Sequence, residues 1–297
     1  MKSPMKRPPT RPARKGRKPL FVIIIPRFED LAGAFYAGEI MKGASIAASR
    51  LDIDFLVHLT ERGDHAEWLS GDLLNPHAID GIVFADIDRD WETVKRAIKA
   101  CIPTVVLNNP SDEPFNCISI GNRGAARAAV GHLLDHGHRR IAHIAGDLNT
   151  QAGQDRLAGY YDALESAGLA RDKKFVKKGG FLRTPARQAA QALLKDVKKD
   201  ERPTAIFAAS DVMAFEVLDV AKALGLQVPE DLSLIGFDNN LAATNQTRLA
   251  TFEQPIVDMA RLGVESLYQM TLGLAQLPVK VNLEARFIKG RTTASLK

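Results

Sequence analysis

Residues 204–224 read TAIFAASDVMAFEVLDVAKAL, a short apolar run followed by a helical pattern. The first five residues have the length of a buried strand, and residues 212–224 form an amphipathic segment that Gly225 ends. Continuously apolar strands that alternate with helices are typical of parallel sheets covered by helices on both faces. This stretch therefore predicts one strand–helix unit of an α/β fold.

The same alternation extends in both directions along the chain. Strands are expected at 20–25, 53–59, 81–85, 104–107, 118–120, 140–145, near 175, 204–208, 232–236 and 279–288. Helices are expected at 38–50, 66–74, 91–100, 123–136, 156–167, 185–198, 212–224 and 256–273. About ten strands are too many for one doubly wound sheet at this length, so the pattern favours two similar α/β lobes in tandem.

The composition is that of a globular domain without a membrane anchor. The chain has 297 residues, of which 45% are hydrophobic and 25% charged. Its longest purely apolar run is 20–25, far below the roughly 20 residues that span a bilayer. The two cysteines form no CxxC pair, which argues against a disulfide framework or a cysteine-rich zinc site. With no apolar stretch typical of a signal peptide, we expect a cytoplasmic protein.

The positive charge is concentrated at the N-terminus. Residues 1–19 hold eight basic residues, five prolines and no acid, and the remainder has 32 basic and 35 acidic residues, a net charge of −3. Like charges and proline predict a disordered basic tail. One interpretation is a weak contact with nucleic-acid phosphates; the other is a solvated leader or linker remnant. The candidate phosphate contacts are Arg11, Arg14, Lys15, Arg17 and Lys18.

The motifs of common enzyme classes are missing. The sequence has no GxxxxGK[ST] loop, GxGxxG turn, HExxH helix or GxSxG elbow. Four of the seven histidines lie within 132–143, but no carboxylate completes a zinc-like spacing. We therefore expect neither an enzyme, nor a metal site, nor a cofactor, although an enzyme acting on a sugar or nucleoside stays open as a third class.

Polar and aromatic residues recur immediately after the expected strands. Ligands of open parallel sheets bind at the carboxyl ends of the strands, which makes these residues candidates for a binding site. The candidate ligand-binding residues are Phe35, Tyr36, Asn108, Arg156, Phe181, Ser210, Asp211, Asp238 and Gln254. Amide, carboxylate, guanidinium and aromatic groups suit a polyhydroxylated small molecule, and no pair of nucleophile and base stands out.

Each candidate also has a structural interpretation. Ser210 could cap the helix that follows it, and Asp211 could interact with the dipole of that helix. Asp238 could close a turn, Arg156 could pair with a surface acid, and Phe181 could belong to the core. The repetition at strand ends favours the binding interpretation.

Five motifs together resemble the LacI/GalR family of transcriptional regulators. They are GNRGA at 121–125, GHRRIA at 137–142, RLAGY at 156–160, AIFAASDVMA at 205–214 and VPEDLSLIGFD at 228–238. The resemblance covers about residues 20–297 and implies an effector-binding core with the periplasmic-binding-protein-like type I fold. That fold has two lobes joined by three crossovers, with the ligand held between them. The implied lobes are 20–120 with 253–278, and 121–252 with 279–297.

The resemblance also implies roles for individual residues. Arg156 is expected to bind polar groups of the effector, Asp238 to complete that clamp and Phe181 to stack on the effector. Asp211 matches an aspartate of the family's motif, and Gln254 matches a glutamine near a lobe junction. Lobe closure would then shift a homodimer between two arrangements.

The sequence departs from the family's pattern at three places. Ser210 replaces a usual asparagine and Asn108 a frequent aspartate, which leaves the identity of the effector open. Only 19 residues precede the first expected strand, so no helix-turn-helix headpiece is expected within this chain. We therefore expect a ligand-responsive LacI-type regulator that binds a sugar or a related molecule. The alternative is a cytoplasmic sugar or nucleoside sensor that does not bind DNA directly.

Overall fold

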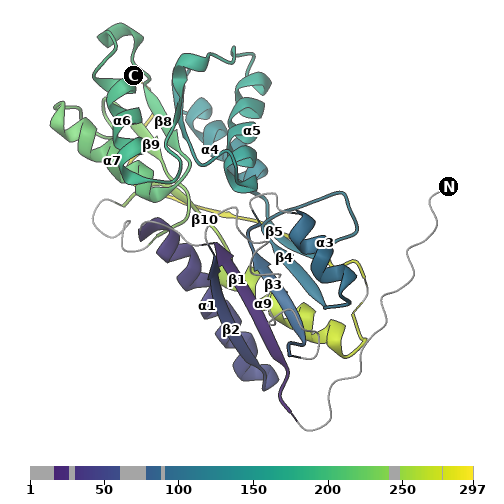
Figure 1. Cartoon of the computed structure of the whole chain (residues 1–297). Coiled ribbons are helices and arrows are strands. Elements are labelled where there is room, and N and C mark those ends of the chain that lie inside the picture. Colours follow the sequence, from purple (N-terminus) through teal and green to yellow (C-terminus); the bar gives the residue numbers. More distant parts are fainter. Residues whose placement is uncertain are drawn as a thin grey trace. The chain divides into compact units, whose positions relative to one another are not determined.

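The structure is a computed structural model that describes residues 17–26, 31–60, 78–87, 91–240, 248–275 and 277–296 (Figure 1). The chain forms two compact units, residues 1–119 with 256–283 and residues 120–255 with 284–297. It passes from one unit to the other three times, as the periplasmic-binding-protein-like fold requires. Each unit is built around parallel strands with helices packed on the sheet, so the predicted fold class is confirmed.

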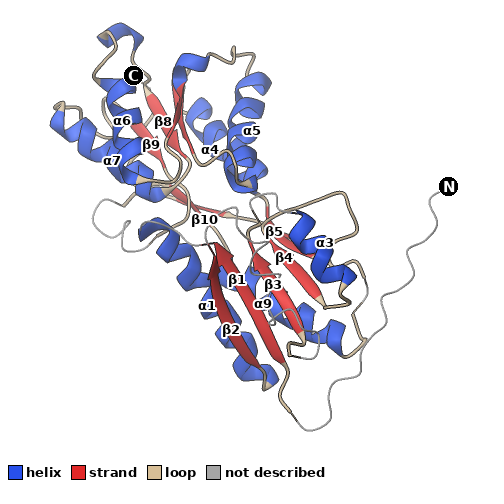
Figure 2. Ribbon diagram, in the orientation of Figure 1, coloured by secondary structure: helices blue, strands red, loops and turns tan. Residues whose placement is uncertain are grey.

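The first unit contains a six-stranded sheet in the order β11-β5-β4-β3-β1-β2 (Figure 2). Its strands are β1 (Leu20–Pro26), β2 (Asp54–Thr60), β3 (Gly81–Ala85), β4 (Thr104–Leu107), β5 (Cys117–Ile120) and β11 (Lys280–Leu283). Its helices are α1 (Leu31–Leu51), α3 (Trp91–Lys99) and α9 (Ile256–Thr271). Strands β1 to β5 pair in parallel, and β1, β3 and β4 are buried because helices cover both faces.

The second unit contains a four-stranded parallel sheet in the order β7-β6-β8-β9 and an antiparallel pair, β10 with β12. Its strands are β6 (Ile141–Ala145), β7 (Val176–Lys178), β8 (Ala205–Ala208), β9 (Ser233–Ile235), β10 (Thr251–Glu253) and β12 (Arg286–Ile288). Its helices are α4 (Asn122–Asp135), α5 (Gln151–Ser166), α6 (Arg183–Leu194) and α7 (Asp211–Ala223), and two 3₁₀ turns lie at Lys173–Phe175 and Lys199–Glu201.

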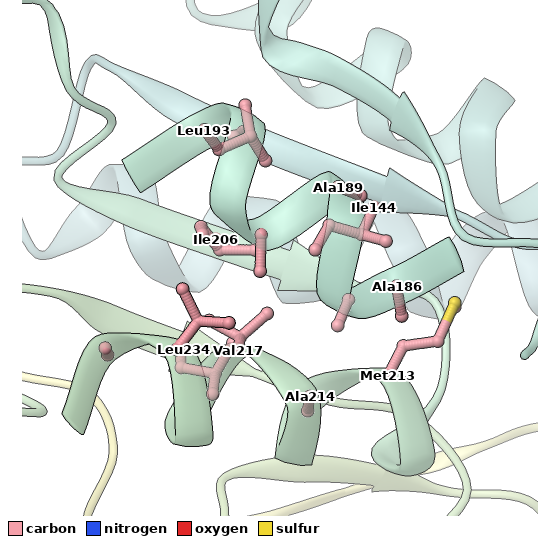
Figure 3. Close-up of a cluster of buried hydrophobic side chains, with 14 of the residues drawn as sticks. Ile144, Ala186, Ala189, Leu193, Ile206, Met213, Ala214, Val217 and Leu234 are labelled. Atoms are coloured by element: carbon pink, nitrogen blue, oxygen red, sulfur yellow. The ribbon is translucent and has the colours of Figure 1, made fainter. Parts of the chain in front are cut away.

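Alternate residues of the strands in the second unit build two separate cores. Ile144, Ile206 and Leu234 pack against α6 and α7, as Figure 3 shows. Phe207 and Ile235 point to the opposite face, where they pack with residues of α4 and α5. This division follows from the two-residue period of a strand, which sends successive side chains to opposite faces.

Several expected boundaries differ from the structure. The run 279–288 is not one strand, because β11 joins the sheet of the first unit whereas β12 pairs with β10 in the second. Residues 279–283 therefore belong to the first unit and not, as expected, to the second. Helix α5 begins at Gln151, since the Thr150 hydroxyl accepts a hydrogen bond from the Gly153 amide at 3.0 Å. The helix expected at 66–74 lies outside the described residues.

None of the helices in the described ranges combines the length and the apolar character needed to cross a membrane.

Candidate functional site

The candidate site of the second unit is centred on Arg156, which is 3% exposed. Its Nε donates to Asn122 Oδ1 at 2.9 Å, and its Nη1 donates to the Ala209 carbonyl at 2.6 Å. Gly159 lets α5 approach α4 closely, because a Cβ there would lie 2.2 Å from the Arg123 carbonyl oxygen. Arg156 is thus held beside Asn122 and the Ala209 carbonyl, which directly follows β8.

Asp238 lies beside this guanidinium, in the turn that follows β9. Its Oδ1 is 3.5 Å from Nη1 of Arg156 and accepts a hydrogen bond from Nε2 of Gln254 at 2.6 Å. Burial raises the pKa of Asp238 to about 6, although Arg156 and Gln254 act in the opposite direction. Oε1 of Gln254 is buried and has no hydrogen-bond partner among the described residues. The structure therefore brings Arg156, Asp238 and Gln254 together.

Two aromatic rings complete this group. Cζ of Arg156 lies 3.8 Å from the ring centroid of Phe237 and 5.6 Å from that of Phe181. Phe181 has a positive φ of 64° and is half-buried, and its ring lies against Gly146 at the end of β6. A Cβ at Gly146 would come within 2.1 Å of Phe181 Cζ, so position 146 must lack a side chain for the ring to lie there. We call Arg156, Phe181, Asp238 and Gln254 the Arg156 cluster.

Ser210 and Asp211 follow β8, but their side chains are engaged inside the second unit. The Ser210 hydroxyl accepts a hydrogen bond from the Met213 amide at 3.3 Å and caps α7. Asp211 is fully buried, with Oδ1 accepting from the Thr251 hydroxyl at 2.6 Å and Oδ2 from the Asn240 amide at 2.8 Å. Burial, followed by the neighbouring Asp238, raises the pKa of Asp211 well above its usual range. For Ser210 the structure shows the capping interaction.

The remaining candidates belong to the first unit. Asn108 follows β4, has a φ of 58° and is buried. Its backbone amide donates to the Ile118 carbonyl at 2.8 Å. Asp86 follows β3 with a φ of 74°, and its Oδ1 accepts a hydrogen bond from Asn109 Nδ2 at 3.1 Å. The half-buried residues 35 and 36 lie in α1, in the helix and not in a loop.

This chain is similar in sequence and in fold to several known proteins. Residues 130–293 match the family model described as a periplasmic binding protein-like domain. The transcriptional regulator CelR of Thermobifida fusca is 33% identical over 263 residues, which cover 86% of this chain and 75% of CelR. The chain belongs to the LacI/GalR family.

A second relative and two solved structures are also similar to this chain. The repressor CytR of Escherichia coli strain K12 is 31% identical over 256 residues, 86% of this LacI/GalR chain and 73% of CytR. The structure of a CelR–cellobiose complex superposes with a TM-score of 0.83 at 29% identity and covers 92% of this chain and 84% of CelR. A lac repressor dimer bound to operator shares the fold, with a TM-score of 0.81 at 22% identity. The match covers 94% of this chain and 96% of the repressor chain. The chain therefore carries the effector-binding core of a family of ligand-responsive transcriptional regulators, which are not enzymes.

The basic tail of this LacI/GalR chain is described only at its end. Arg11, Arg14 and Lys15 lie outside the described residues. Arg17 contacts Asp80 at 3.2 Å and donates to the Ala78 carbonyl at 2.9 Å, and Lys18 Nζ lies 2.5 Å from Asp52. Both residues thus interact with acids of the first unit.

The histidines near the start of the second unit's sheet make structural contacts. Nε2 of His132 lies 3.2 Å from the Thr293 hydroxyl, and Nε2 of His138 lies 2.9 Å from the Ser233 hydroxyl. Within the described ranges, no three His, Cys, Asp or Glu side chains are grouped so that they could hold a metal ion.

Sequence reasoning missed Asn122 and Asp86. Asp86 carried a signal that could have found it, since it directly follows a fully buried strand, as Asn108 does. Asn122 lies in the GNRGA motif at 121–125, but nothing in that motif indicates a contact with Arg156. Asn122 begins α4 and reaches Arg156 from 34 residues away, a contact that only the packing of α4 on α5 creates.

Proposed function

We propose that this LacI/GalR core binds an uncharged, polyhydroxylated effector through the Arg156 cluster. The observation that carries the proposal is the pairing of buried Arg156 with partly buried Asp238, with Phe181 beside the guanidinium and Gln254 on the carboxylate. A carboxylate accepts hydrogen bonds from hydroxyl groups, and an aromatic ring covers the apolar face of a sugar. The CelR–cellobiose complex supports a sugar as the effector.

Charge balance favours an effector without a net negative charge. The guanidinium of Arg156 already faces the Asn122 amide oxygen, the Ala209 carbonyl and the Asp238 carboxylate. An anionic effector would also meet the carboxylate of Asp238, where like charges repel in surroundings of low polarity. A neutral hydroxyl-bearing compound avoids this repulsion. We expect glucose 6-phosphate to bind more weakly than glucose for this reason.

The regulatory step of the proposal is a shift between two arrangements of the core. We propose that Asn108, Phe35 and Tyr36 also contact the effector. An effector shifts the population only as far as its affinities for the two arrangements differ. We propose that a cytoplasmic homodimer of this chain passes this shift on to DNA.

Calorimetry with cellobiose tests the binding role of the cluster. Arg156→Ala and Asp238→Ala are each expected to weaken binding by at least about tenfold, because each removes a charged hydrogen-bonding group that is at least partly buried. Arg127→Ala, an exposed arginine of α4, is the matched control and should leave affinity unchanged. If cellobiose gives no heat, a thermal-shift panel of neutral sugars and nucleosides supplies the probe. Unchanged affinity in both cluster variants would refute the proposal.

A second candidate function is a direct, sequence-independent contact between the tail and DNA. The absence of any acid in residues 1–19 favours it. A gel shift with salt titration distinguishes the candidates, because phosphate contacts give an affinity that falls steeply with salt. Replacing Arg11, Arg14 and Lys15 by alanine should flatten this dependence. An unaltered salt dependence in the triple variant would exclude the tail as the contact.

A further inference from the structure

Asp211 makes three hydrogen bonds to chain segments that surround Asp238. Its backbone amide donates to the Phe237 carbonyl at 2.7 Å, and its Oδ2 accepts from the Asn240 amide at 2.8 Å. Its Oδ1 accepts from the Thr251 hydroxyl at 2.6 Å. Two of these bonds thus lie on either side of the pair Asp238–Asn239.

The backbone of this pair is strained. Asp238 has a φ of 122°, a value that a residue with a side chain adopts only when its surroundings enforce it, and Asn239 follows in the left-handed region with a φ of 56°. On the far side of the turn, the Asp238 amide donates to the Phe252 carbonyl at 2.7 Å, and Asn239 Nδ2 donates to Glu253 at 2.8 Å. Strand β10 and Asp211 therefore hold the turn from both sides.

Gly236 provides the space for this arrangement. A Cβ at position 236 would lie 2.2 Å from Asp211 Oδ1 and 2.8 Å from Leu249 Cδ2. The Asp211 carboxyl group thus lies directly against the glycine. Because Asp211 is fully buried and both of its carboxyl oxygens are used, it has no exposed atom to offer to an effector.

We propose that Asp211 is a positioning residue, which clamps the strained turn so that Asp238 meets Arg156 and Gln254. The inference rests on the proposed binding role of Asp238. It changes the role of Asp211 from the effector contact expected of a polar residue that follows a strand to a support for the residue that makes the contact. Thr251 and Gly236 belong to the same device, one as a hydrogen-bond partner and the other as the space that admits the carboxyl group.

The conservative variant Asp211→Asn separates the two roles. An asparagine oxygen can accept from the Asn240 amide, and its nitrogen can donate to the Thr251 hydroxyl, which also accepts. A positioning residue therefore tolerates asparagine, whereas a carboxylate that binds the effector does not. Asp211→Ala removes both bonds, and Gly236→Ala displaces the carboxyl group without changing Asp211. Asp219→Ala, an exposed acid of the same helix, is the matched control.

Hydrogen exchange followed by NMR gives a readout that needs no effector. Asp211→Ala and Gly236→Ala should speed exchange at the Asn240 amide by at least about tenfold and shift the side-chain amide signals of Gln254. Asp211→Asn and Asp219→Ala should stay within about threefold of the wild type. Unchanged Asn240 and Gln254 signals in Asp211→Ala and Gly236→Ala would overturn the proposal. The exchange measurement needs no effector, so it tests the positioning role of Asp211 even if cellobiose does not bind. Failure of the positioning role and failure of the proposed function are therefore distinguishable.

Cellobiose affinity, or that of the panel compound that binds, completes the test. Asp211→Asn is expected to bind as the wild type does, and Asp211→Ala and Gly236→Ala at least about tenfold more weakly. Equal losses in Asp211→Asn and Asp211→Ala, with normal exchange at Asn240 in the asparagine variant, would show that the carboxylate itself contacts the effector. That outcome would overturn the positioning role.

Discussion

The guanidinium group of Arg156 lies over the ring of Phe237, with 3.8 Å between Cζ and the ring centroid. The same flat group donates to Asn122 from Nε and to the Ala209 carbonyl from Nη1. A planar cation with several donors satisfies all three neighbours at once, which a lysine ammonium cannot do. The shape of this side chain, and not only its charge, is therefore part of the site.

Arg156→Lys should lower the free energy of unfolding by about 2–3 kcal/mol, although the charge is kept. The Asn122 oxygen and the Ala209 carbonyl lose their donors in a buried position, and the contact with the Phe237 ring is lost. Urea denaturation measures the change. Arg127→Lys, an exposed position on α4, should alter stability by less than about 0.5 kcal/mol. Equal stability of the two variants would show that the fork geometry of Arg156 is unimportant.

Effector binding should depend on pH through Asp238. Burial raises the pKa of Asp238 to about 6, so its charge is lost as the pH falls through this value. We expect the affinity for cellobiose, or for the panel compound that binds, to be constant above pH 7. It should then fall by up to about tenfold per pH unit below pH 6. Calorimetry between pH 5 and 8 tests this, and Asp238→Asn should bind weakly without the same dependence. A flat profile in the wild type contradicts the assignment.

Acid should destabilise the second unit through His143. Its Nδ1 is 2.9 Å from the Phe207 carbonyl, its Nε2 is buried without a partner among the described residues, and its ring stacks on Tyr160 and Phe207. Burial lowers the pKa of His143 from 6.5 to about 4. Between pH 6.5 and 4 His143 is protonated in the unfolded chain but neutral in the folded protein. The contribution of His143 to the free energy of unfolding is therefore complete above pH 6.5 and is lost as the pH falls toward 4.

The contribution of His143 over this window is about 3 kcal/mol. His143→Phe retains the ring stack and removes the titration, so its stability should fall less steeply between pH 6.5 and 4 than that of the wild type. Near pH 8 the variant should be less stable by about 1–3 kcal/mol, because the Phe207 carbonyl loses its donor. Urea denaturation at a series of pH values gives both numbers. Parallel pH profiles would mean that His143 accepts a proton in the folded state.

Gly146→Ala should cause a clear loss of effector affinity but only a small decrease in the free energy of unfolding. The new methyl group would collide with the Phe181 ring, which is half-buried and can turn away at moderate cost. We expect at least about a fivefold loss of affinity with a stability change near 1 kcal/mol. Gly124→Ala is the control, since nothing lies within 4 Å of its added carbon, and it should bind normally and be slightly more stable. Normal binding by Gly146→Ala would remove Phe181 from the site.

Most strands could be predicted to within a few residues, whereas α1 begins seven residues and α5 five residues before the expected starts. The strands at 81–85 and 104–107 match the structure, because apolar runs of this length are recognisable without knowledge of their neighbours. The run 279–288 failed for the opposite reason. Its residues are compatible with one continuous strand. The run is divided because β11 lies next to β5 in one sheet and β12 pairs with β10 in another, and both partners are distant in the chain.

The sequence by itself determined the α/β alternation, the family and the positions at which polar residues follow strands, because each depends on residues close together in the chain. Only the tertiary structure decided what those polar residues do. Asp211 and Thr251 are 40 positions apart, and Arg156 and Asn122 are 34 apart, yet these hydrogen bonds set the orientation of the side chains. A buried polar group must find a partner, and which partner lies within reach is decided by the packing of α4, α5, α7 and β10.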